Sequence, residues 1–242
     1  MIPMTSNDSI SFKFNSVSKN TKILWFIFVV ALFVRLLWVL VIDPYPELTG
    51  GDGPFYLHLG NQIAIGSGLS YGEPVAVVGP IYPAYLAIMQ LMFGMDNVIV
   101  SARVGQAFMG VVYSLILFDL GRRCMNVRTG LLAAGLIAID LRFIVETGSI
   151  STETLLGLLL LVNIWLYVIA LENRTRNWWI AVGFVLGITT LTRGVVQFLP
   201  IVFLLHMWCQ RNRLRIWNSW LLLLAGFAIV VLPWVGRNWG IF

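Results

Sequence analysis

The chain has 242 residues, of which 59% are hydrophobic and only 11% are charged, and its mean hydropathy is +0.86. A soluble domain carries about 25% charged residues, so this composition excludes an ordinary soluble globular protein and indicates a polytopic membrane protein. The formal net charge of +5 comes from basic clusters between apolar segments. We therefore attribute it to membrane topology and exclude nucleic-acid binding.

Seven apolar stretches resemble membrane-spanning helices, which need about 20 mostly apolar residues. They are 23–42, 101–120, 129–147, 153–171, 178–192, 195–210 and 217–234. Residues 1–22 are expected to form a mobile cytoplasmic tail. A further apolar stretch, 79–94, is short and carries Pro80 and Pro83, so we expect a peripheral helix there instead of a span.

With 79–94 outside the membrane, the basic clusters between the spans all fall on one side. They are Lys13, Lys19, Lys22, Arg122, Arg123, Arg128, Arg174, Arg176, Arg211, Arg213 and Arg215. Basic residues collect on the cytoplasmic side, which predicts a multi-pass protein of the plasma (inner) membrane with its N-terminus in the cytoplasm. The predicted fold is an all-α membrane protein: one module over 23–242, with seven transmembrane helices and a long outer loop over 43–100.

The outer loop contains a carboxylate before a short helical pattern. Asp52 precedes Phe55, Leu59 and Ile63, which follow a helical spacing, and Pro54 lies in the first turn. This pattern predicts a second peripheral helix along the membrane surface. Two interpretations of Asp52 stay open: it is an N-cap of this helix, or its carboxylate faces the bundle and carries function.

The turn between the third and fourth predicted spans is rich in charge, with Arg142, Glu146 and Glu153. Glu153 follows Ser151 and Thr152, so these residues either cap the next helix or form an acidic site. Asp140 lies just inside an apolar run, where an acid faces a partner or a wet cavity. Arg142 and Arg35 are the candidate partners.

Two arginines, Arg193 and Arg237, fall on the predicted outer side and break the positive-inside pattern. Arg35 lies inside the first span, where it either snorkels to the outer interface or joins them. Because the arginine fork matches phosphate oxygens, these arginines predict a site for an anionic headgroup on the outer face.

Several short motifs in order resemble the C-type membrane glycosyltransferases related to protein O-mannosyltransferases and the bacterial aminoarabinose transferase. The first outer loop carries Gly-Gly-Asp52-Gly-Pro-Phe-Tyr56, Ala64-Ile-Gly-Ser-Gly68-Leu, Gly79-Pro-Ile-Tyr-Pro-Ala-Tyr-Leu-Ala and Leu91-Met-Phe-Gly94. Gly121-Arg-Arg, Ser151-Thr-Glu153-Thr-Leu, Leu191-Thr-Arg193 and Pro233-Trp-x-x-Arg237-Asn238 continue the resemblance to the seventh span.

The resemblance implies a seven-helix module with two peripheral helices, and transfer of a sugar from a polyprenyl-phosphate donor on the outer face. Asp52 corresponds to the catalytic acid and Tyr56 to a substrate-binding tyrosine. Glu153, with Glu146 nearby, matches the second acidic site. Arg237, Arg193 and Arg35 are the expected phosphate contacts. Some relatives also hold a divalent cation, Mg²⁺ or Mn²⁺, which Asp52 and Glu153 would bind here.

Chemically, an aspartate near the sugar C1 is expected to act as general base in an inverting transfer. Relatives continue into further spans or an outer domain, so the chain is expected to be a fragment, a natural minimal module, or half of a complex with a partner chain that completes the transferase. The other expected partners are the lipid-linked donor, membrane lipids and an acceptor of undetermined identity. The alternative function is a non-catalytic subunit that binds or scaffolds lipid-linked sugars. A small transporter is disfavoured because the acids cluster at the outer boundary.

Overall fold

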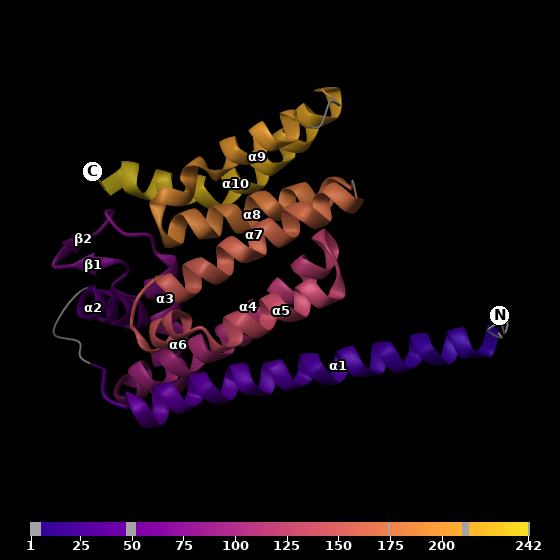
Figure 1. Cartoon of the computed structure of the whole chain (residues 1–242). Helices are drawn as coiled ribbons and strands as arrows, with labels where there is room; N and C mark the ends of the chain where they lie inside the picture. The colour runs from indigo at the N-terminus through magenta and orange to yellow at the C-terminus, as the bar shows by residue number, and fades with distance from the viewer. Residues whose placement is uncertain (1–5, 47–51, 174, 210–212, 242) are drawn as a thin grey trace.

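The computed structural model describes residues 6–46, 52–173, 175–209 and 213–241. Most of them belong to helices that lie side by side as one bundle (Figure 1). The bundle consists of α1 (Ser6–Leu37) with the π-helical turn η1 (Trp38–Ile42), α4 (Val98–Cys124), α5 (Val127–Ile139), α7 (Glu153–Asn173), α8 (Arg176–Thr192), α9 (Leu199–Trp208) and α10 (Arg213–Ile241).

The remaining elements gather at one end of this bundle, which we call the hairpin end (Figure 1). They are α2 (Gly53–Ala64), β1 (Ser70–Tyr71), β2 (Glu73–Pro74), α3 (Ile81–Phe93), the 3-10 turns η2 (Met95–Asn97) and η3 (Gly194–Phe198), and α6 (Leu141–Gly148). The two strands pair antiparallel, with Tyr71 opposite Glu73. Both helices expected in the first long loop are therefore present, as α2 and α3.

Four helical segments in the described residues are long and apolar enough to cross a membrane. They are Asn20–Ile42, Met95–Cys124, Glu153–Asn173 and Trp217–Ile241. The helices α5, α8 and α9 are shorter, with 13, 17 and 10 residues. The sequence-based prediction of a helical membrane protein is confirmed, while the count of seven spans stays a prediction.

The expectation of one continuous span over 129–147 is wrong. The structure has α5 and α6 instead, because the backbone at Asp140 is extended, with ψ of 118°. The Asp140 carboxylate accepts hydrogen bonds from the backbone N–H groups of Arg142 and Phe143, at 3.0 and 3.2 Å. A short polar side chain that caps the backbone in this way competes with a continuous helix and starts a new one.

The described members of the basic clusters between the predicted spans lie at the opposite end of the bundle, which we call the basic end. Arg122 and Arg123 lie in the last turn of α4, and Arg128 and Arg176 in the first turns of α5 and α8. Arg174 and Arg211 lie outside the described residues. The predicted tail over 1–22 is helical from Ser6, where α1 begins. These clustered basic residues thus lie together at one end, while the orientation of that end in the membrane stays a prediction.

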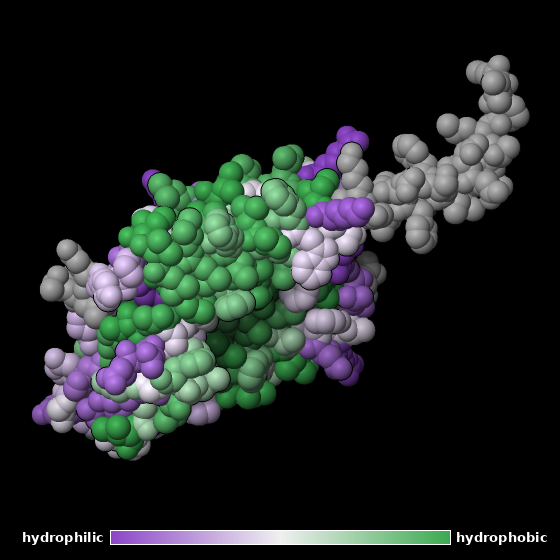
Figure 2. Space-filling view, turned by 90° about the horizontal axis from the view of Figure 1, so that it is seen from below, coloured by the Kyte–Doolittle hydropathy of each residue, from purple (hydrophilic) through white to green (hydrophobic). Residues whose placement is uncertain are grey.

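Between the two ends the surface is apolar. Figure 2 shows a continuous hydrophobic band between hydrophilic ends. On α1 alone, Trp25, Phe26, Val29 and Phe33 each expose more than 60% of their surface. Monomeric soluble proteins rarely expose patches of this kind, whereas lipid tails would cover them in a bilayer.

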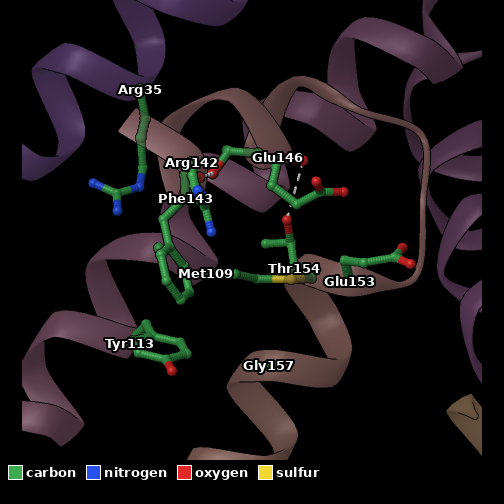
Figure 3. A pocket seen from close by; sticks show the side chains of 11 residues that line it. Arg35, Met109, Tyr113, Arg142, Phe143, Glu146, Glu153, Thr154 and Gly157 are labelled. Carbon is green, nitrogen blue, oxygen red and sulfur yellow. Dashed lines mark hydrogen bonds between the residues drawn. The ribbon is translucent and has the colours of Figure 1, made fainter. Parts of the chain in front are cut away.

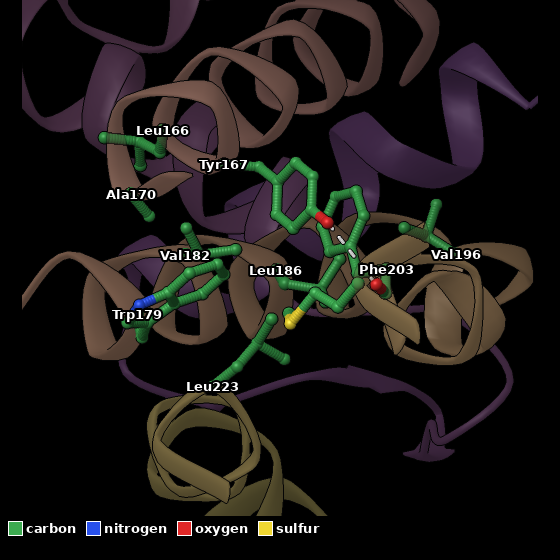
Figure 4. Close-up of a cluster of buried hydrophobic side chains, with 10 residues drawn as sticks. Leu166, Tyr167, Ala170, Trp179, Val182, Leu186, Val196, Phe203 and Leu223 are labelled. Carbon is green, nitrogen blue, oxygen red and sulfur yellow. Dashed lines mark hydrogen bonds between the residues drawn. The ribbon is translucent and has the colours of Figure 1, made fainter. Parts of the chain in front are cut away.

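The main core lies between α7, α8, α9 and α10 (Figure 4). Its centre is Tyr167, whose ring stacks on Phe203 at 4.3 Å between centroids. The Tyr167 hydroxyl forms a hydrogen bond of 2.7 Å with Nδ1 of His206, so its polar group has a partner within the apolar bundle. A second cluster of Tyr82, Leu86, Ala102 and Ile150 lies beneath α2 and fixes α3 against α4.

Two glycines let α8 and α10 approach closely. A Cβ added at Gly183 would lie 1.8 Å from the backbone oxygen of Leu223, and one at Gly226 would lie 2.2 Å from that of Ile180. Small residues at such positions are typical of helix pairs in membranes, where close backbone contact replaces the hydrophobic effect.

Replacing Gly183 with Ala is expected to destabilise the protein by about 1–3 kcal/mol, because the added methyl group forces the two backbones apart. Gly135→Ala is the matched control, since the nearest atom to its added Cβ is 3.9 Å away. That variant is expected to be neutral or stabilised by up to about 1 kcal/mol through helix propensity. Thermal unfolding in detergent measures both, and equal effects at the two positions would contradict the packing argument.

Candidate functional site

The residues singled out in the sequence come together at the hairpin end from four separate elements. Asp52 occupies the N-cap position of α2, and Glu153 is the first residue of α7. Arg193 ends α8, and Arg237 lies near the end of α10. Segments up to 185 residues apart in sequence therefore contribute to one end of the bundle.

The Asp52 side chain is exposed and makes no capping hydrogen bond to the helix it precedes. Its backbone carbonyl accepts from the Tyr56 N–H at 2.9 Å, which starts the helix without the carboxylate. Pro54 in the first turn of α2 also favours the start of the helix, because the fixed φ angle of proline suits this position. Of the two interpretations, side-chain capping is not observed, and the carboxylate is free to interact elsewhere.

Tyr56 lies in the first turn of α2, four residues after Asp52. Burial raises the pKa of its phenol, and the negative charges of Asp52 and Glu153 raise it further. The Tyr56 ring packs edge-on against Tyr82, with 5.2 Å between centroids. The phenol stays neutral at physiological pH and is available as a hydrogen-bond donor.

Glu153 and Arg193 form an ion pair, with 2.7 Å between Oε1 and Nη1. Both side chains are about half exposed, at 43% and 52%. Gly79 helps to hold this region, because an added Cβ there would lie 1.8 Å from the backbone oxygen of Leu191, two residues before Arg193. The outer loop thus packs directly on the end of α8. The pair leaves part of each charged group open to a ligand.

Arg237 connects α10 to the β-hairpin. Its guanidinium donates to the carbonyl oxygens of Val75 and Leu69, at 3.1 and 3.2 Å, and lies over the Trp234 ring at 4.8 Å. A third hydrogen bond, of 2.8 Å, goes to Asn238. Most of the guanidinium group of Arg237 is therefore already hydrogen-bonded within the protein, which gives this residue a structural role at the rim of the site.

Arg35 is neither a snorkelling residue nor an exposed phosphate contact. Only 1% of its surface is exposed, and it donates to the carbonyl oxygens of Ala31, Ile137 and Ala138. The last two belong to the C-terminal turn of α5, where a cation complements the helix dipole. The Asp140 carboxylate accepts from backbone N–H groups and forms no ion pair with an arginine among the described residues, although it remains an electrostatic partner of Arg35, one of the two predicted candidates.

Two buried polar residues that sequence reasoning missed, Arg103 and Gln106, hold the site together. Arg103 is fully buried, forms a 2.8 Å ion pair with Asp43 and donates to Gly148. Gln106 donates to Thr147 and accepts from the Tyr82 hydroxyl at 3.0 Å. They lie one helical turn apart on α4. Two polar residues three positions apart in an otherwise apolar sequence could have indicated that they bind other parts of the protein inside the bundle.

A pocket of about 270 Å³ adjoins Glu153 (Figure 3). Four helices line it: α1 with Arg35, α4 with Tyr113, α6 with Glu146 and α7 with Glu153. Further lining residues are Met109, Gly110, Arg142, Phe143, Thr147, Thr154 and Gly157. Glu146, the other predicted acid of this turn, accepts a hydrogen bond of 2.6 Å from the Ser151 hydroxyl. Glu153 thus belongs both to this pocket and to the group around Tyr56.

The described residues contain no group of three or more His, Cys, Asp or Glu side chains that could hold a metal ion. The two acids that the sequence suggested, Asp52 and Glu153, offer at most two carboxylates. Mg²⁺ is often bound by one or two carboxylates together with substrate phosphates and water. A cation at this site would need such ligands from the substrate.

Comparison with known proteins adds one finding. A family model described as dolichyl-phosphate-mannose-protein mannosyltransferase matches residues 77–236, about two thirds of the chain. No curated protein matches the chain significantly. The matched region includes Glu153, Arg193 and every residue that lines the pocket except Arg35.

Proposed function

The chain belongs to the dolichyl-phosphate-mannose-protein mannosyltransferase family, and from this premise we propose that it transfers a sugar from a polyprenyl-phosphate donor to an acceptor at the hairpin end. Membership makes it a membrane glycosyltransferase of the C type and implies a lipid-linked sugar donor. The observation that supports the finer proposal is that the ion pair of Glu153 and Arg193, at 2.7 Å, lies at the same end of the bundle as the exposed Asp52. The hairpin end faces outward and the basic end faces the cytoplasm.

In the proposed mechanism, Asp52 takes the proton of the acceptor hydroxyl as that oxygen attacks C1 of the donor sugar. The bond between C1 and the phosphate oxygen breaks, so the sugar leaves the lipid with inversion at C1. Asp52 suits this role because its carboxylate is exposed and makes no hydrogen bond to the start of α2.

The leaving polyprenyl phosphate needs its charge stabilised more than it needs a proton. Arg193 is the proposed phosphate contact, because half of its side chain is exposed beside Glu153. Glu153 holds the arginine in place, and the neutral Tyr56 hydroxyl is the proposed hydrogen-bond donor to the substrate. Arg237 and Arg35 support this arrangement through the hairpin and the end of α5.

The direct test uses the purified chain in detergent or in lipid vesicles with radiolabelled polyprenyl-phosphate mannose. Release or transfer of mannose above the level without protein is the expected result. A chain that binds the lipid donor but releases no sugar with any acceptor would support the alternative, a non-catalytic subunit for lipid-linked sugars.

Arg193→Ala is expected to weaken binding of polyprenyl phosphate by about ten- to a hundredfold, the value of one charge-assisted hydrogen bond. Arg128→Ala at the basic end is the control and should leave the affinity unchanged. Equilibrium binding of a labelled lipid measures both. If the two variants bind alike and both remain folded, Arg193 only anchors the end of α8.

A further inference from the structure

The pocket beside Glu153 has a size that selects among ligands. Its volume of about 270 Å³ is at the lower limit of small-molecule pockets, which run from about 300 to 1,000 Å³. It has room for one ring-sized group and not for an entire lipid-linked sugar. Because it adjoins Glu153 on α7, a group bound there would lie next to the proposed reaction centre.

The charges around the pocket balance. The lining residues include two with guanidinium groups, Arg35 and Arg142, and two with carboxylates, Glu146 and Glu153 (Figure 3). A phosphate would gain no net attraction from such a set, whereas a neutral ligand with many hydroxyl groups suits it. Arg35 already donates to three carbonyl groups, and Glu153 already pairs with Arg193.

The other two charged groups retain hydrogen-bonding capacity. Arg142 and Glu146 are four residues apart on α6, a spacing at which opposite charges can pair. Within the described part of the chain they form no ion pair, and the Arg142 guanidinium forms no hydrogen bond. Among the described residues, the Glu146 carboxylate accepts only from the Ser151 hydroxyl, while its backbone carbonyl accepts from Thr154. Arg142 thus offers hydrogen-bond donors and Glu146 offers acceptors. Together they complement the hydroxyl groups of a ligand, because a hydroxyl group both accepts and donates.

An apolar wall completes the pocket. The rings of Tyr113 and Phe143 pack together with 5.3 Å between centroids, and Met109 lies beside them. We infer that the pocket binds one pyranose ring, with Arg142 and Glu146 on its hydroxyl groups and the ring face against Tyr113 and Phe143. This inference rests on the proposed function for the choice of sugar. The ring comes either from the lipid donor or from a sugar already on the acceptor.

The test compares Arg142→Met and Glu146→Gln with the parent protein in binding three probes. The probes are polyprenyl-phosphate mannose, polyprenyl phosphate without sugar, and methyl α-mannoside. Glutamine still accepts the Ser151 hydrogen bond, and Arg142 is exposed, so both variants should fold. Arg128→Met and Glu73→Gln, which lie on exposed surface away from the pocket, are the matched controls.

Each variant is expected to lose about ten- to a hundredfold in affinity for a sugar-bearing probe, the value of one hydrogen bond to a charged group. Affinity for the sugar-free lipid should stay the same. A loss for polyprenyl-phosphate mannose identifies the donor sugar, and a loss for methyl α-mannoside alone identifies an acceptor sugar. Equal loss for the sugar-free lipid, or no loss for any probe, would overturn the inference.

The same data separate this inference from the proposed function. A parent that binds both lipids, with variants that also bind both normally, overturns the pyranose pocket and leaves the proposed function intact. A parent that binds neither lipid overturns the proposed function. If it still binds methyl α-mannoside through Arg142 and Glu146, the pocket stands without the lipid donor.

Discussion

Replacing Asp52 with Asn is expected to lower sugar transfer by about 10²–10⁴-fold, the usual contribution of a general base, while thermal stability stays unchanged. The amide cannot take the proton of the acceptor hydroxyl. Stability should hold because the Asp52 side chain is exposed and makes no capping hydrogen bond. Initial transfer rates and thermal unfolding of the same preparation measure the two effects separately.

The control is Asp96→Asn, which changes another exposed acid of the same loop, in the turn η2. It should retain the parent's activity, because Asp96 is not among the charges that act on Tyr56. Full activity in the Asp52 variant would remove this residue from the mechanism. The case for an enzyme would then rest on family membership alone.

The largest loss of stability is expected from Arg103→Met. Methionine fills much of the same space, but it leaves the Asp43 carboxylate and the Gly148 carbonyl without their donor. Arg103 is buried while the Asp43 side chain is 37% exposed, so the main cost comes from the carbonyl groups of Gly148 and Asp43 that lose their donor, at about 1–3 kcal/mol each. Because these contacts hold the chain after η1 and the turn before α7, we also expect the hairpin end to become accessible to proteases.

Arg123→Met is the matched control on the same helix. Arg123 pairs with Asp119 and Glu172, each at 2.5 Å, but its side chain is 28% exposed at the basic end. Exposed pairs contribute about 0–1 kcal/mol, so this variant should unfold close to the parent. Chemical unfolding in detergent compares the two. Equal losses would mean that burial does not distinguish the two arginines.

Much of the fold was predictable because a membrane limits the choices. Long apolar runs can satisfy their backbone only as helices, which is why 23–42 matches the segment Asn20–Ile42 closely and 217–234 lies within Trp217–Ile241. The stretch 79–94 does form a short helix, α3, at the hairpin end, and its place outside the membrane stays a prediction. Its partner α2 followed from the spacing of Phe55, Leu59 and Ile63.

The wrong predictions have two physical causes. Some side chains bind partners that are distant in the sequence, and others compete with the helix for backbone hydrogen bonds within one turn. A hydropathy profile gives no sign that the Asp140 carboxylate accepts hydrogen bonds from the backbone two and three residues later. These hydrogen bonds end α5 at this position. The partners of Arg35 lie about a hundred residues away, on α5. Which arginine is buried, paired or free is decided by tertiary packing, so Arg103 was overlooked and Arg142 was considered only as a partner for Asp140.

The hydrogen bonds of Arg237 have a consequence for how the protein is made. The hairpin carbonyls of Leu69 and Val75 emerge from the ribosome 168 and 162 residues before the arginine that binds them. At about 5–20 residues per second, that interval is roughly ten to thirty seconds. The hairpin therefore waits, hydrated, until α10 has been synthesised and inserted. The loop that is translated first is the last part of the hairpin end to be secured, so a ribosome stalled before α10 leaves it open to proteases.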